Sequence, residues 1–351
     1  MSDVTIIILA YNSVTKNREI YERCLLSSLE QDYPYKQIIV ADNGSTDNTY
    51  DFSKSVCKER NECRVVKLSR NFGWAGGNNR GAILAKRSKY ILFLNDDAYF
   101  IRRDCVSKLV EYMERDPRLG AVQPVIINRD GSLNLGGVLG FSGFSVLRTS
   151  TRYNLSYLSG AALMVRTSAF LEVGMFDEEL FLYYDDVDFS LRLLAHGWRI
   201  AVVPNCFVFH WESATVGKES PIYLYYTIRN NLWVLAKNSA LGLLPIKIAL
   251  AILGSLNIVG HWIIVQRDVK KLKYVVKGLI EGLTHLGSMI VKNKERIHGY
   301  EDPHIDLEFL CPRTIRSILK QKLFPCQHLY RVKNMNRHRI AKLKNLLSYH
   351  N

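Results

Sequence analysis

The first hundred residues alternate between short apolar runs and stretches with a helical pattern, and this alternation restricts the fold more than any other feature. The apolar runs are rich in β-branched and aromatic residues, as buried strands are. The pattern predicts an α/β fold, Rossmann-like, with a mostly parallel sheet and helices on both faces. We expect strands over residues 4–9, 37–41, 64–68 and 90–94, and helices over 20–31, 47–59 and 76–86. In such sheets, ligands bind at the carboxyl ends of the strands.

The middle third has a different pattern, with a glycine-rich apolar stretch at residues 131–148 that predicts a hairpin or a flexible loop. Around it we expect helices over 104–115 and 185–196, and strands over 121–127, 157–165 and 199–203.

Polar residues follow the expected strands. Ala10-Tyr11-Asn12 closes the first strand, and Asp42 begins an Asp-Asn-Gly-Ser-Thr-Asp string after the second. A carboxylate there can accept hydrogen bonds from a base or a ribose, although the string is equally compatible with a helix cap alone. The glycine-rich loop 69–79 carries a cation and opens a helix, which suits a phosphate, and a tight structural turn is the alternative.

The fourth expected strand ends in Asn95-Asp96-Asp97. Adjacent carboxylates repel each other unless a cation lies beside them, and Mg²⁺ or Mn²⁺ prefers carboxylate and diphosphate oxygens. A divalent cation here would neutralise the charge on a leaving diphosphate. A solvated turn is the alternative.

A second acidic group, Asp185-Asp186-Val187-Asp188, opens a helix. Acidic residues are favoured at helix N-termini, which is a purely structural explanation. Asp186 is also suitably placed to act as a general base. Asp188 and Arg192 are four residues apart and can pair along the helix. His210 stands alone in the sequence, and a lone histidine is more often structural than a ligand.

The basic charge of the chain is concentrated at its C-terminal end. The formal net charge is +14, and from Phe309 onward there are ten basic and no acidic residues. This tail predicts an anionic partner, either membrane lipid or nucleic acid, with a merely solvated surface as the alternative. Because the tail has few aromatic residues among its basic ones, it does not resemble a nucleic-acid platform.

Residues 240–265 are apolar but interrupted by Pro245, Lys247, Asn257 and His261. We expect an interfacial or re-entrant helix pair rather than a clean membrane span, with a buried helix of the catalytic domain as the alternative. The N-terminus shows no signal peptide, and the seven cysteines form no C-x-x-C pair. We therefore expect reduced thiols and a cytoplasmic protein, peripheral on the cytoplasmic face of the cell membrane.

These motifs, in this order, resemble the family 2 glycosyltransferases, and most closely their rhamnosyltransferase-like branch. In that branch a strand like Gly160–Arg166 and a turn like Gly174–Glu178 precede the acidic helix, and the Arg229-Asn230 pair is also similar. The resemblance covers roughly residues 3–237. It implies a GT-A catalytic domain over 1–237, followed by a helical, basic, membrane-associating region over 238–351.

The resemblance also implies roles for individual residues. The nucleotide sugar would be held by Ala10, Tyr11, Asn12, Asp42, Asn71, Gly73, Asn95 and Asp96. Asp97 would bind a divalent metal, Mg²⁺ or Mn²⁺, with His210 as a further ligand, and Asp186 would be the catalytic base beside Asp185. Two positions depart from the family pattern. Asn95 replaces an aspartate of the metal motif, and Asp185 replaces a glutamate of the base motif.

The implied reaction is an inverting transfer from a nucleoside-diphosphate sugar, with rhamnose as the first candidate, to a lipid-linked saccharide. Inversion needs a base on the acceptor hydroxyl and an electrophile at the leaving diphosphate, which Asp186 and a metal at Asp97 would supply. A nucleotidyltransferase is one alternative, but residues 10–16 lack the glycine-rich lysine signature of that class. A catalytically inactive module that docks on membranes or RNA is the other.

Overall fold

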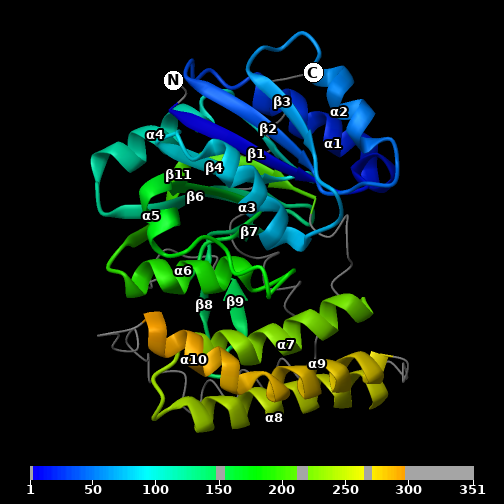
Figure 1. Cartoon of the computed structure of the whole chain (residues 1–351), viewed down its shortest axis with the longest axis vertical. Coiled ribbons are helices and arrows are strands. Elements are labelled where there is room, and N and C mark those ends of the chain that lie inside the picture. The colour runs from blue at the N-terminus through cyan, green and yellow to red at the C-terminus, as the bar shows by residue number, and fades with distance from the viewer. Residues whose placement is uncertain (1–2, 148–154, 212–219, 265–270, 297–351) are drawn as a thin grey trace. The chain divides into compact units, whose positions relative to one another are not determined.

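The computed structural model describes residues 3–147, 155–211, 220–264 and 271–296 (Figure 1). Contacts group the chain into two compact units, Met1–Asp302 and Pro303–Asn351, and all described residues belong to the first. The basic tail from Phe309 therefore lies outside the described residues, and the domain boundary expected after residue 237 remains a prediction.

The first half of the sheet is parallel, as the sequence predicts. Its four strands are β1 (Val4–Ala10), β2 (Lys36–Asp42), β3 (Cys63–Lys67) and β4 (Tyr90–Asn95). Strand β1 pairs with β2 and β4, and β2 pairs with β3. Every residue of β1 is buried, because helices cover both faces of the sheet and leave no polar face to alternate with.

The second half of the sheet is mixed, so the expectation of a mostly parallel sheet is correct only for the first half. The strand order is β3-β2-β1-β4-β10-β6-β11-β5, with β7 beside β6. The added strands are β5 (Ala98–Phe100), β6 (Leu119–Asn128), β7 (Leu133–Asn134), β10 (Ala162–Arg166) and β11 (Arg199–His210). Strand β10 runs antiparallel to both β4 and β6, and β5 runs antiparallel to β11. Only two residues separate β4 from β5, yet β5 pairs with β11 and not with β4.

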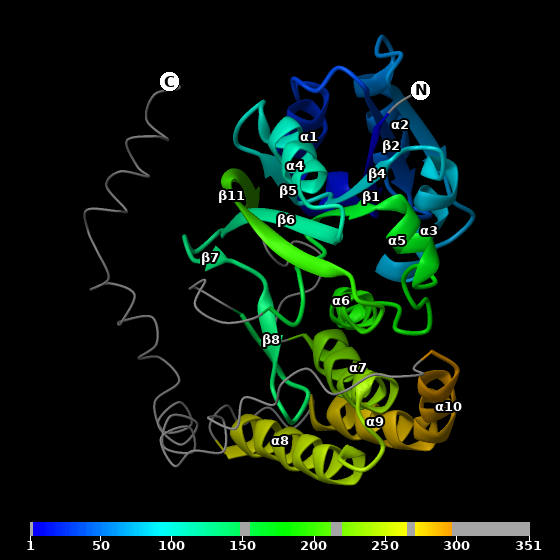
Figure 2. The ribbon, with the colours of Figure 1, turned by 90° about the vertical axis from the view of Figure 1, so that its left-hand side faces the viewer.

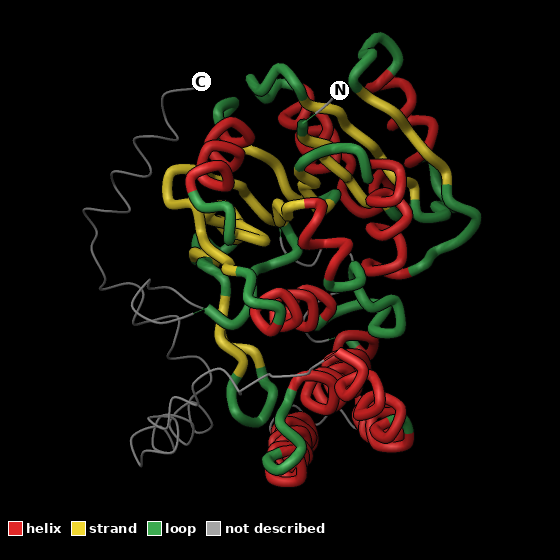
Figure 3. The backbone as a smooth tube through the Cα atoms, turned by 60° about the vertical axis from the view of Figure 1, so that its left-hand side comes forward, coloured by secondary structure: helices red, strands yellow, loops and turns green. Residues whose placement is uncertain are grey.

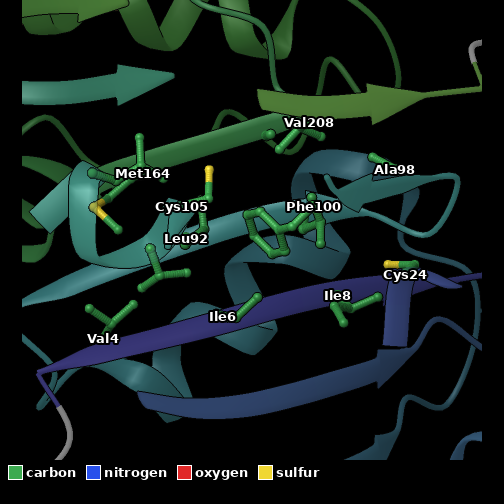
Figure 4. Close-up of a cluster of buried hydrophobic side chains, with 14 of the residues drawn as sticks. Val4, Ile6, Ile8, Cys24, Leu92, Ala98, Phe100, Cys105, Met164 and Val208 are labelled. Atoms are coloured by element: carbon green, nitrogen blue, oxygen red, sulfur yellow. The ribbon is translucent and has the colours of Figure 1, made fainter. Parts of the chain in front are cut away.

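Helices cover both faces of this curled sheet (Figure 3), which confirms that expectation. Side chains of β1 alternate: Ile6 and Ile8 pack with Leu92 in one core, which Figure 4 shows, and Ile7 packs with Phe93 in the other. The first core includes residues of α1 (Ser13–Leu29), α2 (Thr49–Cys57) and α4 (Cys105–Arg115). The second includes residues of α3 (Gly73–Ala85), α5 (Thr167–Glu172) and α6 (Asp185–Ala195).

Two expected elements begin five or more residues from the start that the sequence predicts. Helix α1 starts at Ser13 rather than residue 20, with a non-helical residue at Asn17, and this extra turn brings Ser13 and Lys16 close to the strand ends. The strand expected from residue 157 begins only at Ala162, and Tyr157 forms an isolated bridge with Gly137. The glycine-rich stretch does contain a hairpin, formed by β8 (Gly137–Leu139) and β9 (Ser145–Leu147).

Four helices follow the sheet: α7 (Pro221–Asn238), α8 (Leu244–Ile264), α9 (Leu272–Thr284) and α10 (Leu286–Arg296). Helix α7 lies between α6 and α9 (Figure 2), and all its residues from Ile228 to Asn238 are buried. The helix pair expected within 240–265 is wrong, because α8 is a single helix. Pro245 is its second residue, where the missing N–H costs no hydrogen bond. Across the ranges that the structure describes, no helix is long and apolar enough to cross a membrane.

The expectation of reduced thiols is wrong for four cysteines. Cys57 is paired with Cys63, and Cys105 of α4 is paired with Cys206 of β11, as disulfides. The second pair spans 101 residues, so no local spacing could reveal it. Cys24 is the remaining described cysteine, and it is free and buried.

Candidate active site

The carboxyl ends of β1, β2 and β4 meet at one edge of the sheet. Ala10 is in register with Asp42, and Leu9 is in register with Asn95. The structure therefore brings together the three polar segments that the sequence places after these strands.

Asn12 shapes the turn that follows β2. Its backbone is left-handed, with φ of 50°. Its amide N–H donates to Ser45 Oγ at 2.9 Å, and its Oδ1 accepts from the Thr46 N–H at 2.8 Å. The neighbouring Tyr11 ring lies 5.0 Å from the Lys16 ammonium.

Asp42 is fully buried at the end of β2. Its Oδ1 accepts from the Ser45 N–H at 3.3 Å, and its Oδ2 has no hydrogen-bond partner among the described residues. A buried carboxylate oxygen without a donor is unfavourable. A base or ribose donor would satisfy it, which suits the expected nucleoside contact.

Asn43 ties the glycine-rich loop to β2, although the sequence gave it no role. Its Nδ2 donates to Asn71 Oδ1 and to the Gly73 carbonyl, each at 3.0 Å. Asn71 Oδ1 in turn accepts from the Gly73 N–H at 2.8 Å. Gly73 has φ of 74°, and a Cβ there would lie 2.3 Å from the Phe181 carbonyl oxygen. Asn71 and Gly73 thus determine the loop's shape.

The last residue of β4 and the two residues after it have three different partners. Asn95 Oδ1 accepts from Trp74 Nε1 at 2.8 Å, and Asp96 Oδ2 accepts from the Ser13 hydroxyl at 2.5 Å. Asp97 Oδ1 lies 3.2 Å from His210 Nε2 of β11.

The charges around these residues are strongly coupled. Burial, reinforced by the Asp97 carboxylate, raises the pKa of Asp96 to about 6, although Lys16 and Ser13 act in the opposite direction. Burial also lowers the pKa of Lys16, against the attraction of Asp96 and Asp97. Lys16 therefore places a cation beside this acidic pair. The sequence gave no role to Lys16, and its only signal was its position shortly after the first strand.

Asp97 and His210 fit a divalent cation that a substrate completes. Mg²⁺ keeps several waters and usually takes only one or two carboxylates together with substrate phosphates. The described ranges hold no cluster of three or more His, Cys, Asp or Glu suited to a metal ion. Asn95 does not enlarge the donor set, because its oxygen is already bonded to Trp74. Diphosphate oxygens would have to supply the remaining ligands.

The acidic helix α6 presents Asp186 more openly than Asp185. Asp186 is partly exposed, and its two oxygens accept from the Gly160 N–H at 2.9 Å and the Val187 N–H at 2.8 Å. Asp185 is buried, with an Oδ2 that has no partner in the described structure. Burial raises the pKa of both carboxyls, and the Asp186 charge adds to the increase at Asp185. Of the two carboxylates, Asp186 is therefore the one more accessible from outside the protein.

Trp74 connects the two acidic groups. Its indole N–H donates to Asn95, and a Cβ on Gly160 would lie 2.7 Å from its ring. The Gly160 N–H binds Asp186. The Trp74 side chain thus links Asn95 at the end of β4 to Gly160, which binds Asp186 at the start of α6. In the sequence, Trp74 was recognisable only as part of a glycine-rich loop.

Asp188 faces away from this region and is structural. It pairs with Arg192 at 2.8 Å, as the four-residue spacing predicts, and with Lys237 of α7 at 2.7 Å. Burial alone would raise the pKa of Asp188, but attraction to Lys237 and Arg192 outweighs it and lowers the pKa.

Comparison with known proteins identifies a matching family and two similar enzymes. Residues 5–174 match the profile of the family described as Glycosyl transferase family 2. An N-acetylglucosaminyl-diphospho-decaprenol L-rhamnosyltransferase of Mycobacterium tuberculosis is 29% identical over 236 residues, which cover 58% of this chain and 75% of the relative. The dTDP-rhamnosyl transferase RfbF of Shigella flexneri is 27% identical over 299 residues, covering 80% and 95% of the two chains.

Solved structures show the fold. GalNAc-T7, crystallised with UDP, GalNAc and Mn²⁺, has a TM-score of 0.55 at 16% identity, covering 68% of this chain and 48% of its own. A mannosyltransferase of Pyrobaculum calidifontis in complex with GDP-Man and Mn²⁺ has a TM-score of 0.52 at 17% identity, covering 83% and 87%. S. aureus TarS residues 1–349 give 0.55 at 14% identity, covering 87% and 95%. The mixed α/β fold with its curled sheet is that of GT-A glycosyltransferases.

Proposed function

Because this chain is a family 2 glycosyltransferase similar to rhamnosyltransferases, we propose that it transfers rhamnose, with inversion, from a nucleoside-diphosphate donor to a hydroxyl of a lipid-linked saccharide. The observation that carries the proposal is the contact series from Asp186 through Gly160 and Trp74 to Asn95. It brings Asp186 to the end of the sheet where Asp97 and His210 lie, which suits a base on one side of the reacting carbon and a metal-bound diphosphate on the other.

The donor's nucleoside lies over the ends of β1 and β2. Asp42 Oδ2, buried and without a donor, accepts from the base or ribose. Asn12 and Asn71 keep the surrounding turns in shape, and Tyr11 borders the site. Asp97 and His210 would hold the divalent cation, Mg²⁺ or Mn²⁺, which would neutralise charge on the departing diphosphate. Lys16 adds positive charge on the same side.

Asp186 takes the proton from the acceptor hydroxyl. Backbone N–H groups hold both of its oxygens, so the carboxylate is fixed in direction before the substrate arrives. Its pKa, raised by burial, makes it a stronger base than an exposed aspartate. Asp185 stays buried behind it and supports the start of α6.

The acceptor is a saccharide on a polyprenyl diphosphate, the acceptor class from which the M. tuberculosis relative takes its name. An enzyme with such an acceptor works at a membrane surface. The apolar helix α8 and the basic C-terminal residues supply the two kinds of attraction that peripheral binding to anionic lipid needs. The protein would act at the cytoplasmic face.

The test is a thermal-shift panel of dTDP, UDP, GDP and CDP, each with and without Mn²⁺, on the wild type and on Asp97→Ala. A ligand that binds only the folded state raises the melting temperature. Stabilisation by dTDP that needs Mn²⁺ and is lost in Asp97→Ala is expected. Product formation from dTDP-rhamnose and N-acetylglucosaminyl-diphospho-decaprenol then checks the transfer itself.

No stabilisation by any of the four nucleotides would overturn the proposal and favour a docking module without catalysis. If dTTP and UTP are added to the panel, stabilisation by a triphosphate and by none of the diphosphates would favour a nucleotidyltransferase.

A further inference from the structure

The segment directly before the acidic helix has an unusual backbone. Phe181, Tyr183 and Tyr184 have φ of 63°, 66° and 66°, in the left-handed region that bulky residues rarely adopt. Such a conformation persists only where the surrounding structure enforces it. The next two residues along the chain are Asp185 and Asp186.

Two side chains of α7 hold this segment. The Asn230 amide nitrogen lies 2.9, 2.9 and 2.8 Å from the carbonyl oxygens of Leu180, Leu182 and Tyr183, so its two N–H groups are shared among the three acceptors. Arg229 Nη2 donates to the Leu180 carbonyl and to the Glu179 carbonyl, each at 2.9 Å.

The two holding side chains are themselves fixed. Arg229 Nε donates to Asn230 Oδ1 at 2.9 Å, which directs the Asn230 amide nitrogen toward the segment. The Arg229 guanidinium also stacks 4.1 Å from the Trp233 ring and pairs with Glu281 of α9 at 3.2 Å. Both residues are buried, so they reach the backbone carbonyls and not the substrate.

The same segment also contacts the glycine-rich loop. The backbone N–H of Trp74 donates to the Phe181 carbonyl at 2.6 Å, and Gly73 lies against that same oxygen. Because Asn43 independently ties this loop to β2, a shift of residues 180–184 would act mainly on the start of α6.

We infer that Arg229 and Asn230 are positioning residues, which hold residues 180–184 in the left-handed conformation and thereby direct Asp186 at the acceptor hydroxyl. This inference rests on the proposed function, in which Asp186 is the base. Loss of the Asn230 amide would misplace the base while leaving the nucleoside contacts at Asp42 in place.

The test compares Asn230→Ala with Asn231→Ala, a matched control on the same helix. Asn231 is also buried, but its amide nitrogen donates to the Ser142 carbonyl at 3.2 Å and not to a carbonyl of residues 180–184. With dTDP-rhamnose as donor and N-acetylglucosaminyl-diphospho-decaprenol as acceptor, we expect kcat of Asn230→Ala to fall about 100-fold, as a small misplacement of a catalytic group does. KM for the donor and stabilisation by dTDP should stay within about 3-fold of wild type, and kcat of Asn231→Ala likewise.

Arg229→Lys is the second variant, for the case that Asn230→Ala does not fold. Lysine keeps the charge but not the forked donors, so we expect kcat about 10-fold lower with donor KM preserved. Asp186→Asn is measured in parallel. If Asp186→Asn remains active, the proposed base is wrong. If Asp186→Asn is inactive while the variant at 230 or 229 keeps the wild-type kcat, or loses dTDP binding together with kcat, the positioning role is wrong.

Discussion

Asp42 and Asp185 each keep one buried carboxylate oxygen without a hydrogen-bond donor in the described structure. Such oxygens are uncommon in folded proteins, because leaving them unpaired costs roughly 1–3 kcal/mol. One lies at the proposed nucleoside contact and the other beside the proposed base. Among the described residues, both of these unpaired carboxylate oxygens thus lie at or beside a proposed functional position.

Replacing Asp186 with asparagine tests the base assignment. Asparagine keeps the size of the side chain and can still accept from the Gly160 N–H, but it cannot take a proton. We expect kcat to fall about 10²–10⁴-fold, the usual contribution of a general base. Melting-temperature shifts with dTDP should be unchanged. Glu179→Gln, an exposed neutralisation nearby, is the control and should keep full activity. An active Asp186→Asn enzyme would move the base to another residue.

The pH dependence of kcat follows from the same carboxyl. Burial raises the pKa of Asp186 above its usual value of about 3.9, and only the ionised form can accept a proton. Activity should therefore be full at high pH and fall as the pH decreases through this raised pKa, which lies above pH 3.9. A kcat profile measured with saturating donor and acceptor checks this. An acid limb at or below pH 3.9 would show that an exposed carboxylate is the base.

At the scale of elements, helix α7 connects the sheet domain to the C-terminal helices through buried charges. Lys237 of α7 lies 2.6 Å from Asp177 and 2.7 Å from Asp188, and all three side chains are almost fully buried. Lys292 of α10 also contacts Asp177, at 3.3 Å, from a more exposed position. The C-terminal helices therefore support the segment that precedes and begins α6.

Removing Lys237 should destabilise the fold strongly. Lys237→Ala leaves Asp177 and Asp188 without their main partner, and breaking a buried ion pair in this way costs about 3–5 kcal/mol. Lys292→Ala is the control, and as a partly exposed pair it should cost about 1 kcal/mol or less. Urea unfolding at pH 7 measures both free energies. Equal losses would mean that the buried position of Lys237 has no special weight.

The Lys237 contribution should also depend on pH. The folded-state pKa of Asp188 is lowered, so its stabilisation is fully present above the unfolded value of about 3.9 and is lost as the pH falls through the lower folded-state value. The free energy of unfolding of the wild type should therefore decrease as the pH is lowered below about 4. Lys237→Ala should lose less over that range. Parallel acid curves for the two proteins would contradict this.

At the scale of the whole molecule, apolar and basic surface coincide in the C-terminal part of the chain. Leu253 of α8 is 61% exposed, Ile246 and Ile280 are also exposed, and Lys273 and Lys277 of α9 lie close by in the sequence. The basic tail follows. A surface with both properties suits the headgroup region of an anionic bilayer.

We expect the full chain to sediment with liposomes that contain anionic lipid, and less with neutral ones. Binding should weaken as salt increases, because charge attraction is screened. Leu253→Ser should weaken binding without changing the melting temperature, and Thr284→Ser serves as a neutral exposed control. A purified protein that needs no detergent and ignores anionic liposomes would disprove the membrane proposal.

The local pattern of the sequence determined the four parallel strands, the helices between them, the acidic helix and the motifs at the strand ends. These depend on periodicity and on residue types that lie next to one another in the chain. Only the tertiary structure decided the reversed direction of β10, the Cys105–Cys206 pair and the single helix α8. The same holds for the contacts of Trp74, Asn43 and Lys16 in the site, and for Arg229 and Asn230 on the segment 180–184. The strand pairing, the cysteine pair and the side-chain contacts all join residues from elements that are distant in the sequence. Packing brings these residues together, and no local pattern specifies such pairs.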